Sequence, residues 1–331
     1  MDRLPRGEGG RMDWHKLKLV LIGVLAAANL FLLFMTREQA RTLENIPNEA
    51  IEKLTELLNE DGIYLAEGAL NPKKQSMVIY GGELGEDYYA ETASALSGSD
   101  VSLLFTTPTG VVLTMESGAR CAFSSGFGVR YESAGFAQLL QDVGFFDTEI
   151  RALMENRTLT SPEARAERAV KTAVQSFLEK AALAVQRSSP YTVDYETVYC
   201  GADPKTGVCY AVCEQTVKNQ PLANLCSACA VLDGAVIGMT GEWCFSGLLE
   251  TYSAQLHDQV NILYSVKERI KTEDTAAHTV LQSVSLMYAA FYQADADLFY
   301  LIPTWRITTD ADAEYYLNAV DGSFYTNVDD N

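Results

Sequence analysis

Basic residues are scarce in this chain, because 25 Lys and Arg stand against 44 Asp and Glu and leave a net charge of -19. A chain of this charge repels phosphate backbones, so we expect no nucleic-acid partner. Cysteine is sparse too, at seven of 331 residues, which excludes a small disulfide-stapled scaffold. There is no excess of Pro, Gly or polar repeats, and 48% hydrophobic residues suffice for folded cores.

Histidine is also scarce, and the three residues are His15, His257 and His278. None belongs to an H-E-x-x-H pattern or lies near a Cys at zinc spacing. The G-x-S-x-G and G-x-x-x-x-G-K motifs are absent, and Gly126-Phe127-Gly128 is followed by Tyr131 where a dinucleotide loop needs its third glycine. We therefore expect a protein that is not an enzyme and that holds no cofactor.

Acidic residues offer one motif-like run near the end of the chain. Asp310, Asp312 and Glu314 alternate as in a calcium loop, but Tyr315 occupies the position of the required glycine. Acids that alternate beside a strand are typical of a solvated face, so we expect no metal there. Carboxylate pairs for glycoside hydrolysis are defined by their separation in space, and the sequence alone selects none.

Cysteines give the sharpest pattern, because six of the seven fall between positions 200 and 244: Cys200, Cys209, Cys213, Cys226, Cys229 and Cys244. Their C-x3-C and C-x2-C pairs approximate a zinc ribbon. Cys209 and Cys213, however, have the same parity in an expected strand, which places both on one sheet face. Disulfides and buried free thiols are both favoured over metal, and catalysis ranks last because no His is placed to activate a thiolate.

One long hydrophobic run stands out. Leu19–Met35 has seventeen residues, all apolar or Gly except one Asn, at the short end of the roughly 17–25 that span a bilayer. A cleaved signal peptide has a shorter apolar region, of about 7–15 residues, and an A-x-A-like site. Five basic residues precede the run, so the positive-inside rule places the start of the chain in the cytoplasm. We expect a single-pass protein of the cell membrane with most of its chain extracellular.

Within this run, Gly23 and Ala27 form a small-xxx-small pair that lets another helix approach closely. Asn29 adds an amide that hydrocarbon does not satisfy, so a partner helix is the natural place for its hydrogen bonds. Passive anchors also contain small residues and an occasional Asn. The run by itself therefore supports a helix-pairing anchor and a passive anchor equally.

Beyond the anchor, helical periodicity predicts helices at about 48–61 and 250–271. A third helix, rich in Ala, is expected at about 162–186, because Ser161 is a cap, Pro162 suits the first helical position and Glu163 lies in the first turn. Strands are expected at 77–80, 101–105, 111–115, 192–199, 208–217, 225–232, 236–244, 280–292, 298–308 and 315–320. Runs of strands that follow a helix, without βαβ alternation, predict an α+β fold. A single N-terminal transmembrane helix is followed by two or three units of helix packed on an antiparallel β-sheet.

This organisation predicts boundaries along the chain. The expected parts are a cytoplasmic basic tail at 1–18, a transmembrane helix at 19–35, a membrane-proximal α+β region at 36–150, a middle α+β domain at 151–249 and a C-terminal α+β domain at 250–331.

Both ends of the chain carry a recognisable pattern. Met12–Lys18 runs into the hydrophobic segment and its Asn29–Leu33, and Leu301–Ile307 is followed by Tyr315–Gly322. The first pattern is similar to the start of the YycI family of membrane-anchored regulators, and Met12 is then an alternative initiator. The second is similar to that family's closing strand and hairpin, a pattern shared with PepSY-like modules. The resemblance covers about fifty residues.

The resemblance implies a membrane-anchored extracytoplasmic regulator that binds and modulates a WalK-type sensor histidine kinase of Gram-positive bacteria, a kinase that controls cell-wall metabolism. It also implies a YycH-like companion protein, and it raises the helix-pairing interpretation of Gly23, Ala27 and Asn29 above the passive one. Inhibition or activation, the signal sensed and homodimer formation stay open. Two alternatives are a PepSY-like extracytoplasmic binding or protease-inhibitor module and an anchored extracytoplasmic hydrolase.

Overall fold

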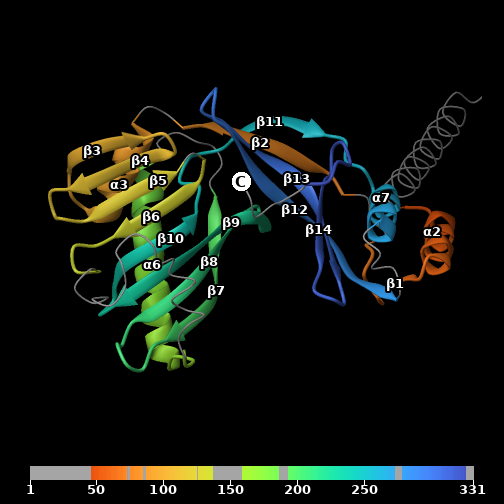
Figure 1. Ribbon diagram of the computed structural model, residues 1–331, viewed down its shortest axis with the longest axis horizontal. Helices are drawn as coiled ribbons and strands as arrows, with labels where there is room; N and C mark the ends of the chain where they lie inside the picture. The colour runs from red at the N-terminus through yellow and green to blue at the C-terminus, as the bar shows by residue number, and fades with distance from the viewer. Residues whose placement is uncertain are drawn as a thin grey trace, which may run out of the picture.

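The computed structural model describes residues 46–325 apart from 72, 74, 85–86, 125, 137–158, 186–192 and 273–277. These residues form four helices and fourteen strands in two lobes (Figure 1). The large lobe contains α3 (Tyr88–Ser97), α6 (Ala164–Val185), β3 (Val101–Thr107), β4 (Gly110–Met115), β5 (Arg120–Ser124), β6 (Gly128–Glu132), β7 (Asp194–Ala202), β8 (Cys209–Val217), β9 (Gln220–Leu232) and β10 (Ala235–Glu242). The small lobe contains α2 (Asn48–Glu60), α7 (Gln259–Thr272), β1 (Ile63–Leu65), β2 (Met77–Glu83), β11 (Leu249–Ala254), β12 (Thr279–Gln293), β13 (Leu298–Thr309) and β14 (Glu314–Asn318).

The strands of the described residues join in one mixed sheet with the order β11-β2-β13-β12-β9-β10-β6-β5-β4-β3, to which β1, β7, β8 and β14 are attached. Most neighbours are antiparallel, but β12 pairs in parallel with both β1 and β9. The expected fold of separate units, each a helix on an antiparallel sheet, is therefore wrong. The reason is pairing between distant segments, since β2 lies between β11 and β13, and β6 pairs with β10.

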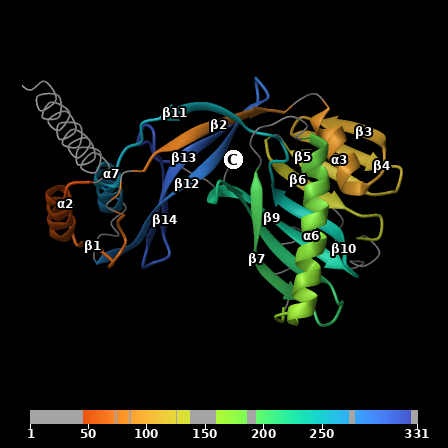
Figure 2. The same ribbon diagram turned by 180° about the vertical axis from the view of Figure 1, so that it is seen from behind.

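In the large lobe, α6 covers one face of the sheet (Figure 2). Its apolar residues recur every three or four positions, so Val170, Val174 and Phe177 lie on one side of the helix and are buried. They share a hydrophobic core with Cys229 and Met239 of the sheet. Each aliphatic side chain buried in this way stabilises the fold by roughly 1.5–3 kcal/mol.

In the small lobe, α2 and α7 pack on each other beside β1 and β12. Leu54 and Leu58 of α2 share a core with Val266 of α7, and all three are fully buried. Asp61, directly after α2, accepts a hydrogen bond from Lys267 Nζ at 2.9 Å. This bond lowers the pKa of the Asp61 carboxyl, so the first helix after the expected anchor is tied to α7 by apolar and ionic contacts.

The two lobes meet where β9 and β12 run side by side. Leu222 of β9 and Tyr288 of β12 form the register pair between these two strands, and the side chain of Asn224 bonds to the β12 backbone beyond it. Tyr288 and Phe299 of the small lobe belong to the same hydrophobic core as α6. The junction is therefore a packed continuation of the sheet.

The helices expected at 48–61 and 162–186 are confirmed as α2 and α6. The helix expected at 250–271 is wrong in its first part, because residues 249–254 form β11 and α7 begins at Gln259. Residues 249–254 pair with β2, a partner that helical spacing does not report. The start of α7 is marked by Asp258, whose Oδ1 accepts a hydrogen bond from the backbone N–H of Asn261 at 3.0 Å.

Within the described part of the chain, no helix has both the length and the apolar composition needed to cross a membrane. The expected transmembrane helix at 19–35, with Gly23, Ala27 and Asn29, lies outside the described residues.

Candidate functional site

Four of the clustered cysteines lie on the face of the sheet that α6 covers. Cys200 of β7 pairs with Ala211 of β8, and Ala211 pairs with Cys229 of β9. Cys209 and Cys213 stand two residues on either side of Ala211, so all four thiols surround it on one face. The parity expected for Cys209 and Cys213 is therefore confirmed.

The chemistry of these thiols is that of buried, protonated groups. The structure has all seven cysteines as free thiols, and no group of His, Cys, Asp or Glu among the described residues is arranged to hold a metal ion. Burial raises the pKa of Cys200 and Cys213 to about 11 and that of Cys244 to about 12. A thiolate nucleophile is therefore scarce at neutral pH, and the cluster fills the core as small hydrophobes do.

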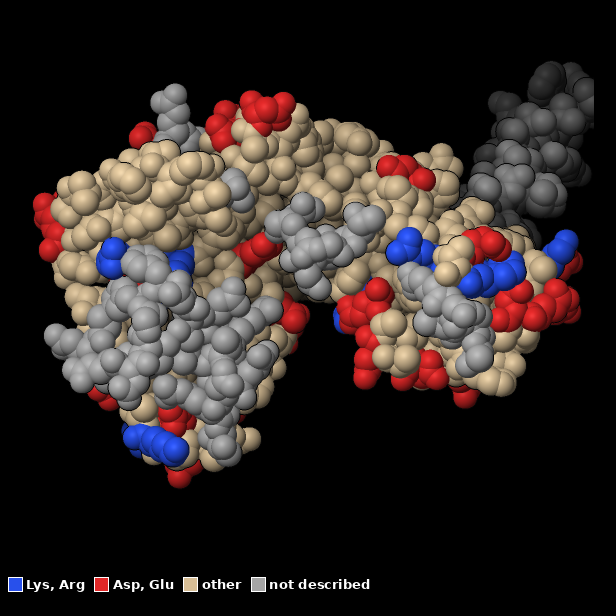
Figure 3. Space-filling model, viewed as in Figure 1, with Lys and Arg blue, Asp and Glu red and all other residues tan. Residues whose placement is uncertain are grey.

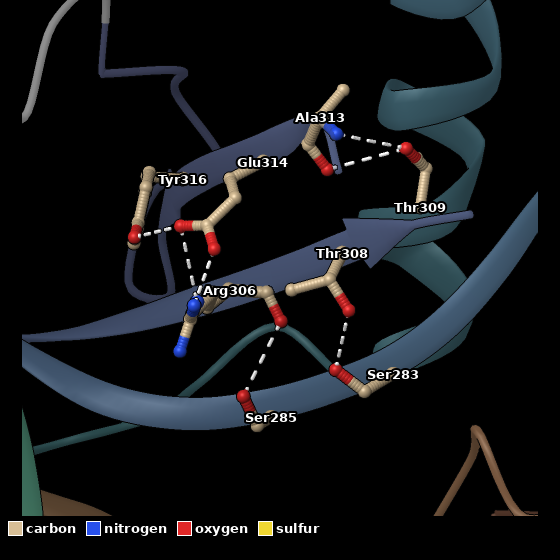
Figure 4. Close-up of polar contacts among 8 residues, drawn as sticks. All are labelled: Ser283, Ser285, Arg306, Thr308, Thr309, Ala313, Glu314 and Tyr316. Carbon is tan, nitrogen blue, oxygen red and sulfur yellow. Dashed lines mark hydrogen bonds and ion pairs between the residues drawn. The ribbon is translucent and has the colours of Figure 1, made fainter. Parts of the chain in front are cut away.

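The acidic run at the end of the chain is part of a hairpin (Figure 4). Glu314 accepts hydrogen bonds from Arg306 of β13 and from the Tyr316 hydroxyl. Thr309 Oγ1 accepts the backbone N–H of Ala313 at 3.1 Å, which closes the turn. Asp310 Oδ1 accepts the backbone N–H of Val280 at 2.9 Å. These carboxylates therefore connect strands rather than converge on one point.

The described histidines lie apart from each other and from the thiols. His257 is exposed, and its carbonyl oxygen accepts a hydrogen bond from Trp305 Nε1 at 2.9 Å. His278 stacks on Tyr64, with ring centroids 5.9 Å apart. Both act through backbone or ring contacts, and neither lies beside one of the cysteines in the sheet.

A cavity of about 760 Å³ opens on the face of the large lobe opposite α6, lined by Arg130, Asn224, Cys226 and Glu242 among others. Arg130 Nε donates to Glu132 Oε1 at 2.9 Å, and only 2% of the Glu132 side chain is exposed. Burial raises the pKa of the Glu132 carboxyl, and Arg130 opposes that rise. The cavity therefore has polar walls in which the Arg130 guanidinium is already paired.

The most unusual surface is β3, which ends the sheet and pairs only with β4 in the described part of the chain. Its centre presents three successive large apolar residues, with Leu103 63% exposed, Leu104 52% and Phe105 64%. Residues 101–115 contain no charged side chain, and the upper left of the space-filling view, where Figure 1 places β3 to β5, is largely free of charge (Figure 3). We call Leu103, Leu104 and Phe105 the β3 patch.

Sequence reasoning assigned 101–105 to a strand but not to an interaction surface. A strand that is buried on one face alternates apolar and polar residues. Three large apolar residues in a row break that alternation, and this break indicates that at least one of them is exposed. Natural proteins protect the open edges of their sheets with charge, proline or a covering element. The β3 patch has no charged or proline residue. A long, uncharged, apolar edge of this kind is typical of a binding surface.

Comparisons with known proteins name no function, so the β3 patch is the main structural feature on which a functional proposal can be based. No family model matches the chain, and no curated protein is detectably similar to it. Among solved structures, the crystal structure of an uncharacterized protein from Eubacterium rectale matches with a TM-score of 0.47 and 11% sequence identity. The match covers 81% of this chain and 91% of that one.

Proposed function

We propose that the protein is a membrane-anchored, extracytoplasmic regulatory protein that binds a sensor histidine kinase. The resemblance of its two ends to the YycI family makes a WalK-type kinase the partner. The observation that carries the proposal is the β3 patch, an uncharged sheet edge that presents apolar side chains on both faces of the strand.

An open strand edge determines what kind of partner surface fits. The edge of β3 offers a row of backbone N–H and C=O groups that another extended segment pairs with, as in β-strand addition. The whole chain carries a net charge of -19, whereas the patch carries no charge, so apolar contact outweighs charge attraction at the patch. The fitting occupant is an uncharged, extended segment in the outer domain of the kinase.

The expected membrane helix supplies the second contact. Gly23 and Ala27 allow close approach of a kinase helix, and Asn29 provides a hydrogen bond to it, worth about 1 kcal/mol in such settings. Two weak contacts on one molecule act together, because binding at one raises the effective concentration at the other. A YycH-like companion is the proposed third component.

The test is co-purification of the full-length chain with the kinase from membranes. A Leu104→Lys, Phe105→Lys double variant changes the patch, and a Gly23→Leu, Asn29→Leu double variant changes the helix. Each is expected to lower recovery of the kinase at least tenfold. Leu183→Lys, on an exposed α6 position, is the matched control and leaves recovery unchanged.

Equal recovery with all three variants contradicts the proposal. Loss of kinase only with the patch variant favours the alternative of an extracytoplasmic binding module that needs no helix contact. Self-association through the patch, with no kinase retained, assigns the edge to a second copy of this chain. Hydrolysis of wall or peptide substrates by the purified protein favours the alternative of an anchored hydrolase.

A further inference from the structure

The end of the sheet opposite β3 is a second open edge. β11 is the last strand there and, among the described strands, pairs only with β2 (Figure 1, Figure 2). Leu249 is 60% exposed and Tyr252 55%, and Thr251 and Ser253 are exposed as well. The register with β2 shifts between Glu250 and Tyr252, and pairing continues on both sides of the shift. β11 contains no Pro or Lys, the residues that often protect such an edge, so another strand can be added to it.

The neighbouring strands extend this edge into a surface. Leu249 of β11 and Tyr300 of β13 are both register partners of Gly81 in β2, so their side chains lie on one face of the three strands. Tyr252 is the partner of Ile79, two residues before Gly81, and therefore lies on the same face. We call Leu249, Tyr252 and Tyr300 the β11 patch.

The strands around the β11 patch carry acidic residues. β2, β11 and residues 293–303, which include the turn between β12 and β13, contain Glu83, Glu250, Asp295 and Asp297 but no Lys or Arg. Glu83 and the two aspartates are exposed, and Figure 3 shows acidic side chains at the upper margin of the molecule, where Figure 1 places that turn. Exposed carboxylates grouped in this way attract a cationic partner.

Aromatic and acidic groups together favour a basic partner segment. A Lys or Arg side chain is attracted by the carboxylates and also by the face of a tyrosine ring. The protein contains one such contact on the opposite face of β2, where Lys218 Nζ lies 5.3 Å from the centroid of the Tyr80 ring. The two ends of the sheet therefore differ, since the β3 patch is uncharged and the β11 patch has acidic neighbours.

We propose that β11 is a second strand-addition site, which binds an extended segment of a protein partner that presents apolar and basic side chains to the β11 patch. This site goes beyond the proposed kinase complex, because it lies at the other end of the sheet and uses no residue of the β3 patch. A protein with a different partner at each end of one sheet brings those two partners together.

The test is a fluorescence anisotropy titration of the full-length chain with the fluorescein-labelled peptide RTVTVTR, whose Arg and Val side chains lie on one face when it is extended. We expect saturable binding. The peptide ETVTVTE reverses the charge and should bind about tenfold more weakly or less. RTVPVTR keeps the charge but replaces a backbone N–H by proline, and should also lose about tenfold. This last peptide separates strand addition from general attraction to an acidic protein.

Variants of the protein locate the site. Tyr252→Lys removes a ring and adds a like charge, and should weaken RTVTVTR about tenfold. Leu183→Lys, at an exposed α6 position, is the matched control, and Leu104→Lys in the β3 patch should also leave binding unchanged. A Glu83→Gln, Asp295→Asn double variant changes only exposed side chains, so it should weaken binding about threefold without changing the melting temperature.

Four results would overturn the proposal. They are absence of RTVTVTR binding, equal binding of RTVTVTR and either comparison peptide, unchanged binding by both the Tyr252→Lys and the Glu83→Gln, Asp295→Asn variants, and loss of binding with Leu104→Lys. A dimer in sedimentation that Tyr252→Lys dissociates assigns β11 to a second copy of this chain and also overturns it. None of these results changes the kinase co-purification, which depends on the β3 patch and the membrane helix.

Discussion

Asn224 of β9 bonds to Ala290 of β12 in the way that a neighbouring strand does. Asn224 Nδ2 donates to the Ala290 carbonyl at 2.8 Å, and the Ala290 N–H donates to Asn224 Oδ1 at 2.9 Å. One side-chain amide thus satisfies both backbone groups of a residue that is 3% exposed. The parallel pairing that begins at Leu222 and Tyr288 is extended by a side chain where the two backbones separate.

Asn224→Ala is expected to destabilise the junction between the lobes. It leaves the N–H and the carbonyl of Ala290 without their partner, which costs about 1–3 kcal/mol of unfolding free energy. Chemical denaturation measures the loss, and faster hydrogen exchange at the Ala290 amide locates it. Asn59→Ala, on the exposed side of α2, is the control, with a change within about 0.5 kcal/mol. Equal changes in the two variants contradict this role for Asn224.

The thiols are expected to stay unreactive until the chain unfolds. Burial raises the pKa of Cys121 and Cys244 to about 12 and that of Cys213 to about 11, so very little thiolate exists at pH 8. A colorimetric thiol reagent without reductant should find all seven thiols in denaturant and miss the buried ones in the native chain. A count below seven in denaturant identifies disulfides, the alternative that the sequence left open.

Acid should weaken the hairpin that carries Glu314. Its hydrogen bond from Arg306 lowers the pKa of the Glu314 carboxyl below the ordinary value of 4.5. A lowered native pKa gives stability that is present above the unfolded pKa and is lost as the pH falls through the native one. Glu314→Gln should therefore cost about 0.2–1 kcal/mol at pH 7, and the cost should shrink as the pH falls below the unfolded pKa. A loss that is independent of pH rules out this ionic contribution.

The β3 patch should tolerate charge without loss of stability. Leu104 is 52% exposed, so Leu104→Lys is expected to change the unfolding free energy by about 0.5 kcal/mol or less and to reduce self-association. Leu113 is its register partner on β4 and is fully buried. Leu113→Lys should therefore unfold the large lobe, with a loss above about 3 kcal/mol. Sedimentation and thermal melts separate the two results, and a melt of Leu104→Lys that resembles Leu113→Lys contradicts the exposed position.

Local patterns predicted the elements whose burial repeats along the chain. The start at Ser161 and Pro162 predicted α6, and the spacing of Leu54 and Leu58 predicted α2, because a helix start and a helix face are each written in neighbouring residues. The pairing of strands was not predictable in the same way. Residues 249–254 become a strand because β2, more than 160 positions earlier, supplies a free edge. That partner leaves no periodic trace in either segment, and the sheet that unites the two lobes was missed for the same reason.

The candidate site was predictable only in part. The shared face of Cys209 and Cys213 followed from strand parity, and the run at Leu103–Phe105 was visible as a strand. The exposure of the β3 patch was missed, because it results from the position of β3 at the end of the sheet, where β4 is its partner strand in the described part of the chain.

Strand β12 connects the two lobes as one continuous strand. It has 15 residues and, at about 3.4 Å per residue, extends roughly 50 Å. Near its start it is bonded to β1, next to the helix that follows Ile46, and near its end it is bonded to β9 of the other lobe. A force applied to the chain at Ile46 is therefore transmitted along β12 to the large lobe. We expect the large lobe to tilt under such a force, because the paired strand does not lengthen.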